Sequence, residues 1–331
     1  MAARLLEIRS LHVGFNVYGG TLKVLNGINL GMEEGEKVGL VGETGCGKTT
    51  TAKSTLRILP TPPARIFGGE ILFKGEDILK MGPREIRRVQ AQGISMIFQD
   101  PTAALNPVFT IGEQLMDAIK YSTSRDGLSK REIRSRAIAA LRDVALPDPE
   151  RILENYPIQL SGGMRQRICI AMALATESEL LIADEPTTSL DVTIQDQVLR
   201  LLGNLVLEKE TSTILITHSL GLVREWTERV YVMYAGSMVE AAPTAELFVN
   251  PLHPYTQGLL KAVPKLTGEG IAEGIPGRIP DYLNPPPGCR FHPRCPQAMP
   301  LCEEQQPPFF DVDGGHQAAC YLYQGGDKDG E

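Results

Sequence analysis

The sequence lacks any apolar run of the about 18 residues that a membrane-spanning helix needs. Its first seven residues, MAARLLE, contain no apolar core of signal-peptide length. Internal repeats of solenoid period and long low-complexity tracts are also missing. We therefore expect a soluble protein that stays in the cytosol, so any role at a membrane must come through a partner.

Positive charge is scarce as well, since the 331 residues carry a formal net charge of −7. Nucleic-acid-binding proteins usually present a basic face, so this balance argues against that class. The hydrophobic fraction of 42% is ordinary for a globular protein and is sufficient for a substantial core. A chain of this length predicts one large domain and a smaller one.

Short apolar runs alternate with helical patterns as far as about residue 245. Such runs have the character of buried strands at residues 37–41, 94–98, 180–183 and 213–216. Residues 230–234 and 237–239, joined by the Ala235-Gly236 turn, predict a closing hairpin. Buried strands separated by helices predict a mainly parallel sheet covered on both faces.

Helices are predicted at residues 48–59, where Pro60 stops the pattern, and at 130–144. Strand signals vanish between about residues 102 and 176, which predicts a helical insertion. Beyond residue 245 proline and glycine become frequent and apolar periodicity fades. This last part is predicted to be a loop-rich appendage that its own core would not stabilise.

Residues 42–49 have the sequence GETGCGKT, which fits the phosphate-binding pattern G-x-x-x-x-G-K-[ST] between a predicted strand and a predicted helix. Glycines allow successive backbone N–H groups to turn toward a polyanion, and the helix N-terminus adds partial positive charge. Lys48 is predicted to reach the β- and γ-phosphates, and the Thr49 hydroxyl to bind Mg²⁺. The predicted nucleotide-binding residues of this loop are Gly42, Glu43, Thr44, Gly45, Cys46, Gly47, Lys48, Thr49 and Thr50.

Two acidic residues, Asp184 and Glu185, directly follow the predicted strand at residues 180–183. Asp184 is placed to hold Mg²⁺, and Glu185 to polarise the attacking water. An apolar strand that ends in two acids is common by itself, so the pair takes its meaning from the phosphate-binding loop.

Residues 160–167, LSGGMRQR, resemble the signature motif of ATP-binding-cassette (ABC) proteins, and they lie between the phosphate-binding loop and Asp184 as in that family. Ser161 is predicted to cap the following helix, whose start Gly162 and Gly163 leave open. The resemblance implies that this helix start, with Gln166, binds the γ-phosphate of a nucleotide held by a facing subunit.

The other family positions occur in the expected order. Gln99 resembles the Q-loop glutamine, which contacts Mg²⁺ and senses a permease. Asp191, in the run Ser189-Leu190-Asp191, resembles the D-loop that crosses the dimer interface, and His218 resembles the switch histidine that steadies the γ-phosphate. Phe15 is the first candidate for the aromatic that stacks on adenine, and Tyr18 the second.

These resemblances divide the site residues by role. The catalytic residues they imply are Glu185, His218 and Gln99. The Mg²⁺ ligands they imply are Thr49, Gln99 and Asp184.

Four stretches resemble the oligopeptide/dipeptide importer branch of the ABC family and its D-type ATPase subunit: FQDP at 98–101, LNP at 105–107, ADEPTTSLDVT at 183–193 and HPYT at 253–256. This implies an ATPase that powers the import of di- or oligopeptides from the cytoplasmic face of the cell membrane, where it lies peripherally. The implied partners are a paralogous ATPase subunit in a heterodimer, two transmembrane permease subunits and an extracytoplasmic substrate-binding protein. Oligosaccharides are an alternative cargo.

Other classes fit less well. ABC proteins of translation usually carry two cassettes, and those of DNA repair contain a long coiled coil that is missing here. A degenerate subunit is disfavoured because Lys48, Asp184 and Glu185 are intact. Two positions depart from the family pattern: Cys46 replaces a more usual serine, which predicts a thiol-sensitive loop, and Ile158 stands where histidine is frequent.

Four of the six cysteines, Cys289, Cys295, Cys302 and Cys320, lie in the last fifth of the chain. A cytosolic setting disfavours disulfides. Zinc is possible, with His292 and His316 as additional ligands, although the close C-x₂₋₄-C pairs of zinc knuckles are missing. The stretch CRFHPRC at 289–295 resembles peptide-importer subunits that hold a [4Fe–4S] cluster, so the resemblance favours a structural cluster bound by the four cysteines, with Zn²⁺ as the alternative.

The sequence as a whole predicts the α/β fold of ABC-type P-loop NTPases, with a mixed sheet, a helical subdomain at about residues 102–176 and a small C-terminal metal-binding appendage. Residues 1–245 are predicted to form the nucleotide-binding domain. Residues 246–331 are predicted to form a peptide-importer-type C-terminal domain with the four-cysteine site.

Overall fold

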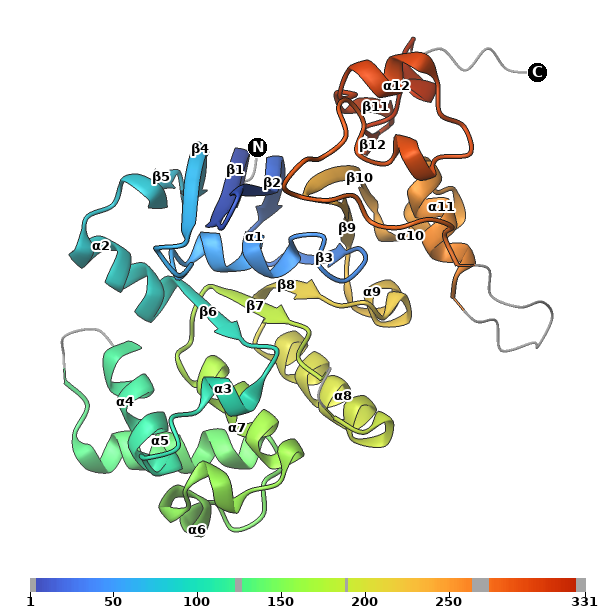
Figure 1. Cartoon of the computed structure of the whole chain (residues 1–331). Helices are drawn as coiled ribbons and strands as arrows, with labels where there is room; N and C mark the ends of the chain where they lie inside the picture. Colours follow the sequence, from blue (N-terminus) through green and yellow to red (C-terminus); the bar gives the residue numbers. More distant parts are fainter. Residues whose placement is uncertain (1–3, 123–126, 188–189, 264–273, 326–331) are drawn as a thin grey trace. The chain divides into compact units, whose positions relative to one another are not determined.

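The computed structural model describes residues 4–122, 127–187, 190–263 and 274–325. The chain divides into two compact units, with unit 1 formed by Met1–Lys80 and Ile216–Glu331, and unit 2 by Met81–Leu215. Unit 1 therefore combines residues from the two ends of the chain. Figure 1 labels the helices and strands.

The first sheet of unit 1 is antiparallel and has the strand order β2-β1-β4-β5. Its strands are β1 (Arg4–Val17), β2 (Gly20–Glu33), β4 (Ala64–Phe73) and β5 (Glu76–Asp77). Leu6, Leu11 and Val13 of β1 are buried, and the register shifts at several points along the β1–β2 pair. These shifts interrupt the alternation of polar and apolar residues, which explains why no clear two-residue period marks β1 in the sequence.

The second group of strands in unit 1 is mixed and has the order β11-β12-β10-β9-β3. The strands are β3 (Lys37–Val41), β9 (Arg229–Tyr234), β10 (Ser237–Pro243), β11 (Phe310–Asp313) and β12 (His316–Ala318). β3 runs parallel to β9, whereas β9 and β10 form the predicted antiparallel hairpin. The strand at residues 37–41 and the hairpin are thus confirmed.

The helices of unit 1 are α1 (Lys48–Thr55), α9 (Leu220–Trp226), α10 (Thr244–Val249), α11 (Pro254–Lys261) and α12 (Pro300–Glu304). Three short 3₁₀ segments, η1 (Ile78–Lys80), η4 (His292–Arg294) and η5 (Tyr321–Tyr323), complete it. The prediction that α1 continues to residue 59 is wrong. Arg57 adopts a left-handed conformation with φ 50°, and such a residue ends a helix before Pro60 is reached.

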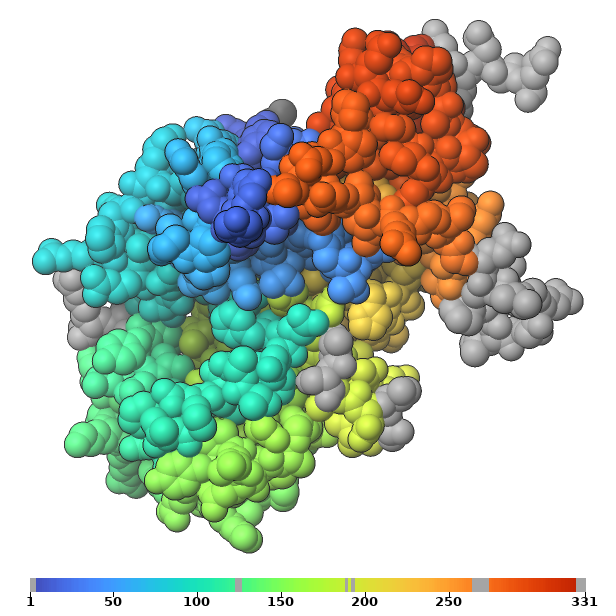
Figure 2. Space-filling view, viewed as in Figure 1, coloured from blue at the N-terminus to red at the C-terminus, as the bar shows by residue number. Residues whose placement is uncertain are grey.

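The C-terminal residues share the core of unit 1. Phe291 is 2% exposed, and its ring centroid lies 5.0 Å from that of Tyr234 in β9 and 5.5 Å from that of Tyr255 in α11. Strand β12 also pairs with β10, with Ala318 opposite Glu240. Figure 2 shows the C-terminal residues, in orange and red, against the blue N-terminal strands of the same unit. The C-terminal segment therefore takes its core support from the rest of unit 1, because its aromatic residues pack around β9.

Unit 2 contains a parallel pair, β6 (Ile94–Ile97) and β7 (Leu180–Asp184), with Ile94 opposite Leu180. All but the last residue of β8 (Ser212–Ile216) belong to this unit, and the strand order is β8-β7-β6. The strands predicted here from apolar runs are confirmed. The helical segments are α2 (Pro83–Arg88), the π-turn η2 (Val89–Gly93), α3 (Pro101–Ala104), α4 (Ile111–Ser122), α5 (Lys130–Asp143), α6 (Pro149–Glu154), η3 (Pro157–Gln159), α7 (Gly162–Ala175) and α8 (Val192–Glu208).

Candidate functional site

The glycine-rich loop at residues 42–49 lies between β3 and α1 in unit 1. Two of its glycines are required by close packing, since a Cβ at Gly42 would lie 2.1 Å from the Met233 carbonyl oxygen and one at Gly47 would lie 2.7 Å from the Leu25 side chain. Gly45 has φ 82°, and no described atom lies within 4 Å of where its Cβ would be. The loop thus packs on the protein at Gly42 and Gly47 and presents an open face at Gly45.

Lys48 is buried, and its ammonium group donates hydrogen bonds back into this loop. Nζ lies 2.8 Å from the Gly42 carbonyl oxygen and 3.2 Å from that of Glu43. A bound polyanion would offer stronger, charge-assisted acceptors to the same group. Cys46 is 1% exposed, and burial raises the pKa of its thiol to about 11. The predicted thiol sensitivity of the loop is therefore not supported, because a buried, protonated thiol reacts slowly.

Residues of the C-terminal part of unit 1 bind the loop from outside. The Glu43 N–H donates to the Tyr255 hydroxyl oxygen at 2.9 Å, and the Tyr282 hydroxyl donates to the Gly45 carbonyl oxygen at 2.8 Å. The guanidinium of Arg294 pairs with the Glu43 carboxylate through two nitrogens, at 2.8 and 3.1 Å. Sequence reasoning missed these three residues. Sequence clues were available for two of them, since Tyr255 lies in the HPYT stretch and Arg294 in the CRFHPRC stretch.

The two acidic residues and the glutamine predicted to act together are in unit 2. Asp184 ends β7 and is 1% exposed, whereas Gln99 follows β6, the parallel neighbour of β7. The Gln99 side-chain Nε2 donates to the Glu185 carboxylate at 2.9 Å, so the structure brings these two predicted residues together. Glu185 has φ 44°, an unfavourable backbone conformation for a residue other than glycine. Such strain is frequent where a side chain must be held for chemistry.

The motif at residues 160–167 forms the start of α7. The Ser161 hydroxyl oxygen accepts a hydrogen bond from the Met164 N–H at 3.3 Å and caps the helix as predicted. Gly162 and Gly163 occupy its first turn, and Gln166 is fully buried. Among the described residues neither polar atom of the Gln166 amide has a hydrogen-bond partner. Asp191 occupies the N-cap position of α8 without a side-chain capping hydrogen bond, while Ser189 lies outside the described residues.

The remaining predicted site residues lie in unit 1. His218 is exposed two residues after β8. Phe15 is half-buried in β1, opposite Leu22 of β2 and Ala64 of β4. Tyr18 lies in the β1–β2 turn and is fully exposed. Unit 1 thus carries the phosphate-binding loop, His218 and both aromatic candidates, and unit 2 carries the acidic pair, Gln99 and the capped helix α7.

Comparison with known proteins identifies the family. Residues 25–188 match the model of the ABC transporter family, and residues 239–302 match that of the oligopeptide/dipeptide transporter C-terminal region. The chain is 46% identical over 319 residues to a probable peptide ABC transporter ATP-binding protein, y4tR, of Sinorhizobium fredii, covering 96% of this chain and 94% of that protein. It is 45% identical to the dipeptide transport ATP-binding protein DppD of Bacillus subtilis, over 96% of this chain and 95% of that one. The chain belongs to the ATP-binding subunits of ABC transporters.

Solved structures agree with this assignment of the ABC subunit. A dimeric post-hydrolysis structure of the ATP-binding cassette MJ0796, bound to ADP and Pi, matches with a TM-score of 0.64 and 25% identity, over 72% of this chain and 98% of that one. CbiO1 of Clostridium perfringens matches with a TM-score of 0.60 and 26% identity, over 75% and 92% of the two chains. The protein is an ABC-type ATPase with the predicted P-loop fold and mixed sheet, and its expected ligands are ATP and Mg²⁺.

Within the described residues of this ABC subunit, no helix is both long and apolar enough to cross a membrane. Its six cysteines are free thiols. The Cys289 N–H donates to the Cys302 carbonyl oxygen at 2.8 Å. Burial, with smaller contributions from Cys302, Cys320 and Cys295, raises the pKa of the Cys289 thiol to about 11. The backbones of Cys289 and Cys302 are therefore adjacent in unit 1.

A metal site is nevertheless not assembled in the part of this ABC subunit that the structure describes. No group of three or more His, Cys, Asp or Glu side chains there is arranged to hold a metal ion. The two histidines considered as extra ligands have other partners. His316 Nε2 lies 2.7 Å from the Glu240 carboxylate, and His292 Nδ1 lies 2.9 Å from the Cys289 carbonyl oxygen. The thiols provide a suitable donor set without the geometry of a bound metal.

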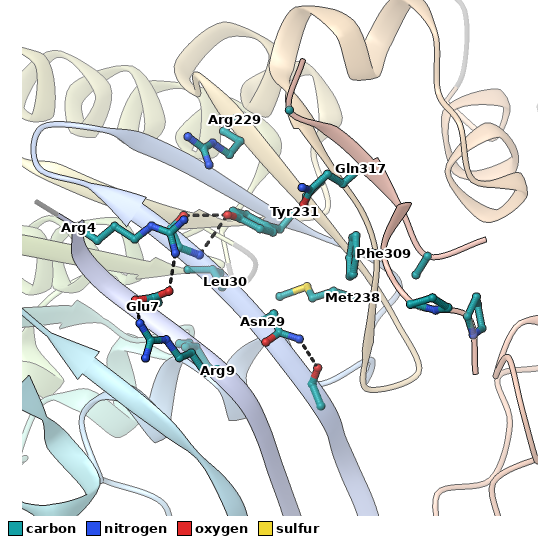
Figure 3. Close-up of a pocket in the computed structure, with 18 of the residues that line it drawn as sticks. Arg4, Glu7, Arg9, Asn29, Leu30, Arg229, Tyr231, Met238, Phe309 and Gln317 are labelled. Atoms are coloured by element: carbon teal, nitrogen blue, oxygen red, sulfur yellow. Dashed lines mark hydrogen bonds and ion pairs between the residues drawn. The ribbon is translucent and has the colours of Figure 1, made fainter. Parts of the chain in front are cut away.

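Unit 1 of this ABC subunit also contains an open pocket of about 750 Å³ between the first sheet and the C-terminal residues. Figure 3 shows Arg4, Arg9 and Glu7 on one side of it and Phe309 and Gln317 on the other. Each arginine at this pocket has a carboxylate partner, since Arg4 pairs with Glu7, Arg9 with both Glu7 and Glu70 (3.7 Å), and Arg229 with Glu36 at 2.9 Å. The pocket therefore presents no excess of positive charge for an anionic ligand.

Proposed function

We propose that this ABC ATPase powers the import of di- or oligopeptides from the cytoplasmic face of the cell membrane. The match of residues 239–302 to the oligopeptide/dipeptide transporter C-terminal region carries this proposal. The likeness to the dipeptide transport protein DppD and to the oligopeptide transport protein OppD of Bacillus subtilis supports it; OppD is 43% identical over 96% of this chain and 89% of that one.

Uptake of a labelled dipeptide, tetrapeptide and oligosaccharide by cells with and without the gene tests the cargo. We expect the loss of the gene to abolish peptide uptake, and the Lys48→Ala variant to fail to restore it. Loss of oligosaccharide uptake alone would replace peptides with sugars as the cargo.

In the proposed mechanism Lys48 holds the β- and γ-phosphates of ATP, and Phe15 stacks on the adenine. Thr49, Gln99 and Asp184 would hold Mg²⁺, which neutralises charge on the phosphates when bound. Glu185 orients and polarises the attacking water, held in place by the hydrogen bond from Gln99 at 2.9 Å. His218 steadies the γ-phosphate. Positioning and charge stabilisation supply most of the rate in such a reaction.

The proposed site is composite. Ser161, Gly162, Gly163 and Gln166 of one subunit would face the nucleotide held by another, with Asp191 at the interface. Helix α7 begins directly after Ser161, and the backbone N–H groups at such a helix N-terminus can bind a phosphate group. The second subunit is proposed to be a paralogous ATPase in a heterodimer. We expect the purified chain alone to be mainly monomeric and weakly active, and full activity of a monomer would contradict the proposal.

Two transmembrane permease subunits and an extracytoplasmic substrate-binding protein are the other proposed partners. Unit 2 exposes apolar side chains suited to a permease helix, among them Val108 at 71% and Ile158 at 83%. Solvent-exposed apolar groups near one another frequently mark such an interface. The Ile158→Asp variant should lose co-purification with the permease while retaining nucleotide binding. Unchanged co-purification would place the interface elsewhere.

We also propose that Cys289, Cys295, Cys302 and Cys320 hold a structural [4Fe–4S] cluster, supported by the CRFHPRC stretch and by the backbone contact between Cys289 and Cys302. Anaerobic purification should yield a brown protein with about four irons per chain. Cys302→Ser should lose the iron, whereas Cys169→Ser, at an isolated cysteine in unit 2, should keep it. A colourless anaerobic protein with one tightly held zinc would assign the site to Zn²⁺ instead.

The division of the chain at residue 245 remains part of this proposal. Residues 1–245 would act as the nucleotide-binding domain, with a helical subdomain at about 102–176, and 246–331 as the C-terminal domain. The separate family matches at 25–188 and 239–302 support this division.

A further inference from the structure

Arg294 is a largely enclosed cation in the C-terminal part of unit 1. Its side chain is 4% exposed, whereas the carboxylate side chain it binds, that of Glu43, is 26% exposed. Besides the two bonds to Glu43, its nitrogens donate to the carbonyl oxygens of Pro276 and Ile275, each at 2.9 Å. Its guanidinium also lies 5.6 Å from the ring centroid of Tyr234. Contacts on every side fix this cation in a single orientation, with its fork directed at the phosphate-binding loop.

The charge of Glu43 explains why such a partner is useful. Glu43 is the second residue of the loop, so a carboxylate stands next to backbone groups that must receive a triphosphate. An unpaired negative charge there would repel the incoming polyanion. A bidentate arginine neutralises the carboxylate and also holds the side chain that carries it.

Two tyrosine hydroxyls fix the backbone of the same loop. Tyr255 is fully buried, and its oxygen accepts from the Glu43 N–H, which orients the peptide group before Glu43. Tyr282 donates to the Gly45 carbonyl oxygen, at the open part of the loop. Because a carbonyl directed at the nucleotide would repel phosphate oxygens, holding it in a hydrogen bond keeps that face available to N–H donors.

We propose that Arg294 and Tyr282 are positioning residues for ATP binding, which brace the phosphate-binding loop and cancel the charge of Glu43. This inference rests on the assignment of residues 42–49 as the nucleotide site. It gives the C-terminal segment a direct part in nucleotide affinity, in addition to any structural role of its cysteines.

Titration of the purified full-length chain with a fluorescent ATP analogue and Mg²⁺ tests the proposal, with nucleotide-free melting temperatures measured in parallel. Arg294→Gln should raise the Kd about tenfold, the order expected when a loop carboxylate loses its charged partner. The double variant Glu43→Gln/Arg294→Gln should return the Kd to within about threefold of the wild-type value, because it removes the repelling charge as well. Tyr282→Phe should raise the Kd about threefold, as expected for one lost hydrogen bond, without a large change in melting temperature.

The matched control is Glu36→Gln. Glu36 pairs with Arg229 of unit 1 at 2.9 Å, so this variant also removes the carboxylate of an arginine pair. Glu36 precedes β3, whereas the phosphate-binding loop follows that strand. Its Kd should equal that of the wild type.

Two results would overturn the proposal. One is a wild-type Kd in Arg294→Gln or in Tyr282→Phe. The other is a double variant no better than Arg294→Gln, which would reduce Arg294 to a structural residue. If Arg294→Gln does not fold, the Kd of Tyr282→Phe for the ATP analogue tests whether the C-terminal segment braces the loop. A wild-type chain that fails to bind Mg-ATP would instead contradict the proposed function.

Discussion

Replacing Phe291 by alanine tests whether the C-terminal segment shares the core of unit 1. Phe291 is 2% exposed and makes ring contacts with Tyr234, His253 and Tyr255 at centroid distances of 5.0, 5.6 and 5.5 Å. Truncation removes a buried aromatic ring and leaves a cavity in rigid surroundings. We therefore expect a loss of about 3–5 kcal/mol in the free energy of unfolding. In a unit of this size each kcal/mol lowers the melting temperature by about 2–4 °C, so the shift should be roughly 10 °C.

The assay can observe unit 1 selectively. The single tryptophan of the chain, Trp226, lies in α9 of unit 1, so its fluorescence reports the unfolding of that unit. The matched control is Phe67→Ala in β4, because Phe67 is 52% exposed and belongs to the same unit. The Phe67 ring makes a cation–π interaction with Arg65 at 5.3 Å, and because the ring is half exposed its loss should cost no more than about 1 kcal/mol. Equal shifts for Phe291→Ala and Phe67→Ala in the tryptophan-monitored transition would refute the shared core.

Three further predictions concern the acid pair, the buried histidine and the signature helix. Glu185→Gln should leave the Kd for ATP nearly unchanged and lower kcat by about 10²–10⁴-fold in the assembled transporter. If this variant hydrolysed ATP at the wild-type rate, Glu185 would not be the residue that polarises the attacking water. Burial lowers the pKa of His253 from 6.5 to about 4, so between these values the unfolded chain binds a proton that the folded chain does not. The free energy of unfolding of unit 1 should accordingly fall by on the order of 1–3 kcal/mol as the pH decreases through this range. His253→Asn keeps a side chain that can cap α11, and melting curves at several pH values should show a weaker dependence of stability on pH for this variant. Ser161→Ala should lower the free energy of unfolding by about 1 kcal/mol because the α7 cap is lost, whereas Ser161→Thr should retain most of that stability. Equal urea midpoints for the two variants would argue against the cap.

The parts of the fold that sequence patterns predicted are those whose stabilising contacts produce a local signature. The strands at residues 37–41 and 180–184 carry the apolar runs 38–41 and 180–183 because both of their faces are buried. The β9–β10 hairpin was predictable because Ala235 and Gly236, both with positive φ, form its turn. Gln99 and Glu185 were each predicted as catalytic residues through their motifs, and the structure joins them by a hydrogen bond.

The parts that were missed depend on contacts between distant residues or on backbone geometry. No local pattern indicates that Phe291 packs on Tyr234, since aromatic residues in a proline-rich segment carry no period. The pairing of Arg294 with Glu43 spans 251 residues. The left-handed backbone of Glu185 likewise leaves no trace in the sequence, because glutamate has no preference for that conformation.

That separation of 251 residues also has a consequence for biosynthesis. Ribosomes extend chains at about 5–20 residues per second, so Arg294 is synthesised roughly 10–50 s after Glu43. During this interval the nascent chain contains the phosphate-binding loop without the arginine that pairs with its carboxylate. The strand partner β12 and the tyrosine donor to Gly45 are also translated after the loop, β12 later still than Arg294. The order of translation therefore delays a fully braced nucleotide site until the C-terminal segment has left the ribosome and docked, which makes maturation of this site a late event in the life of each molecule.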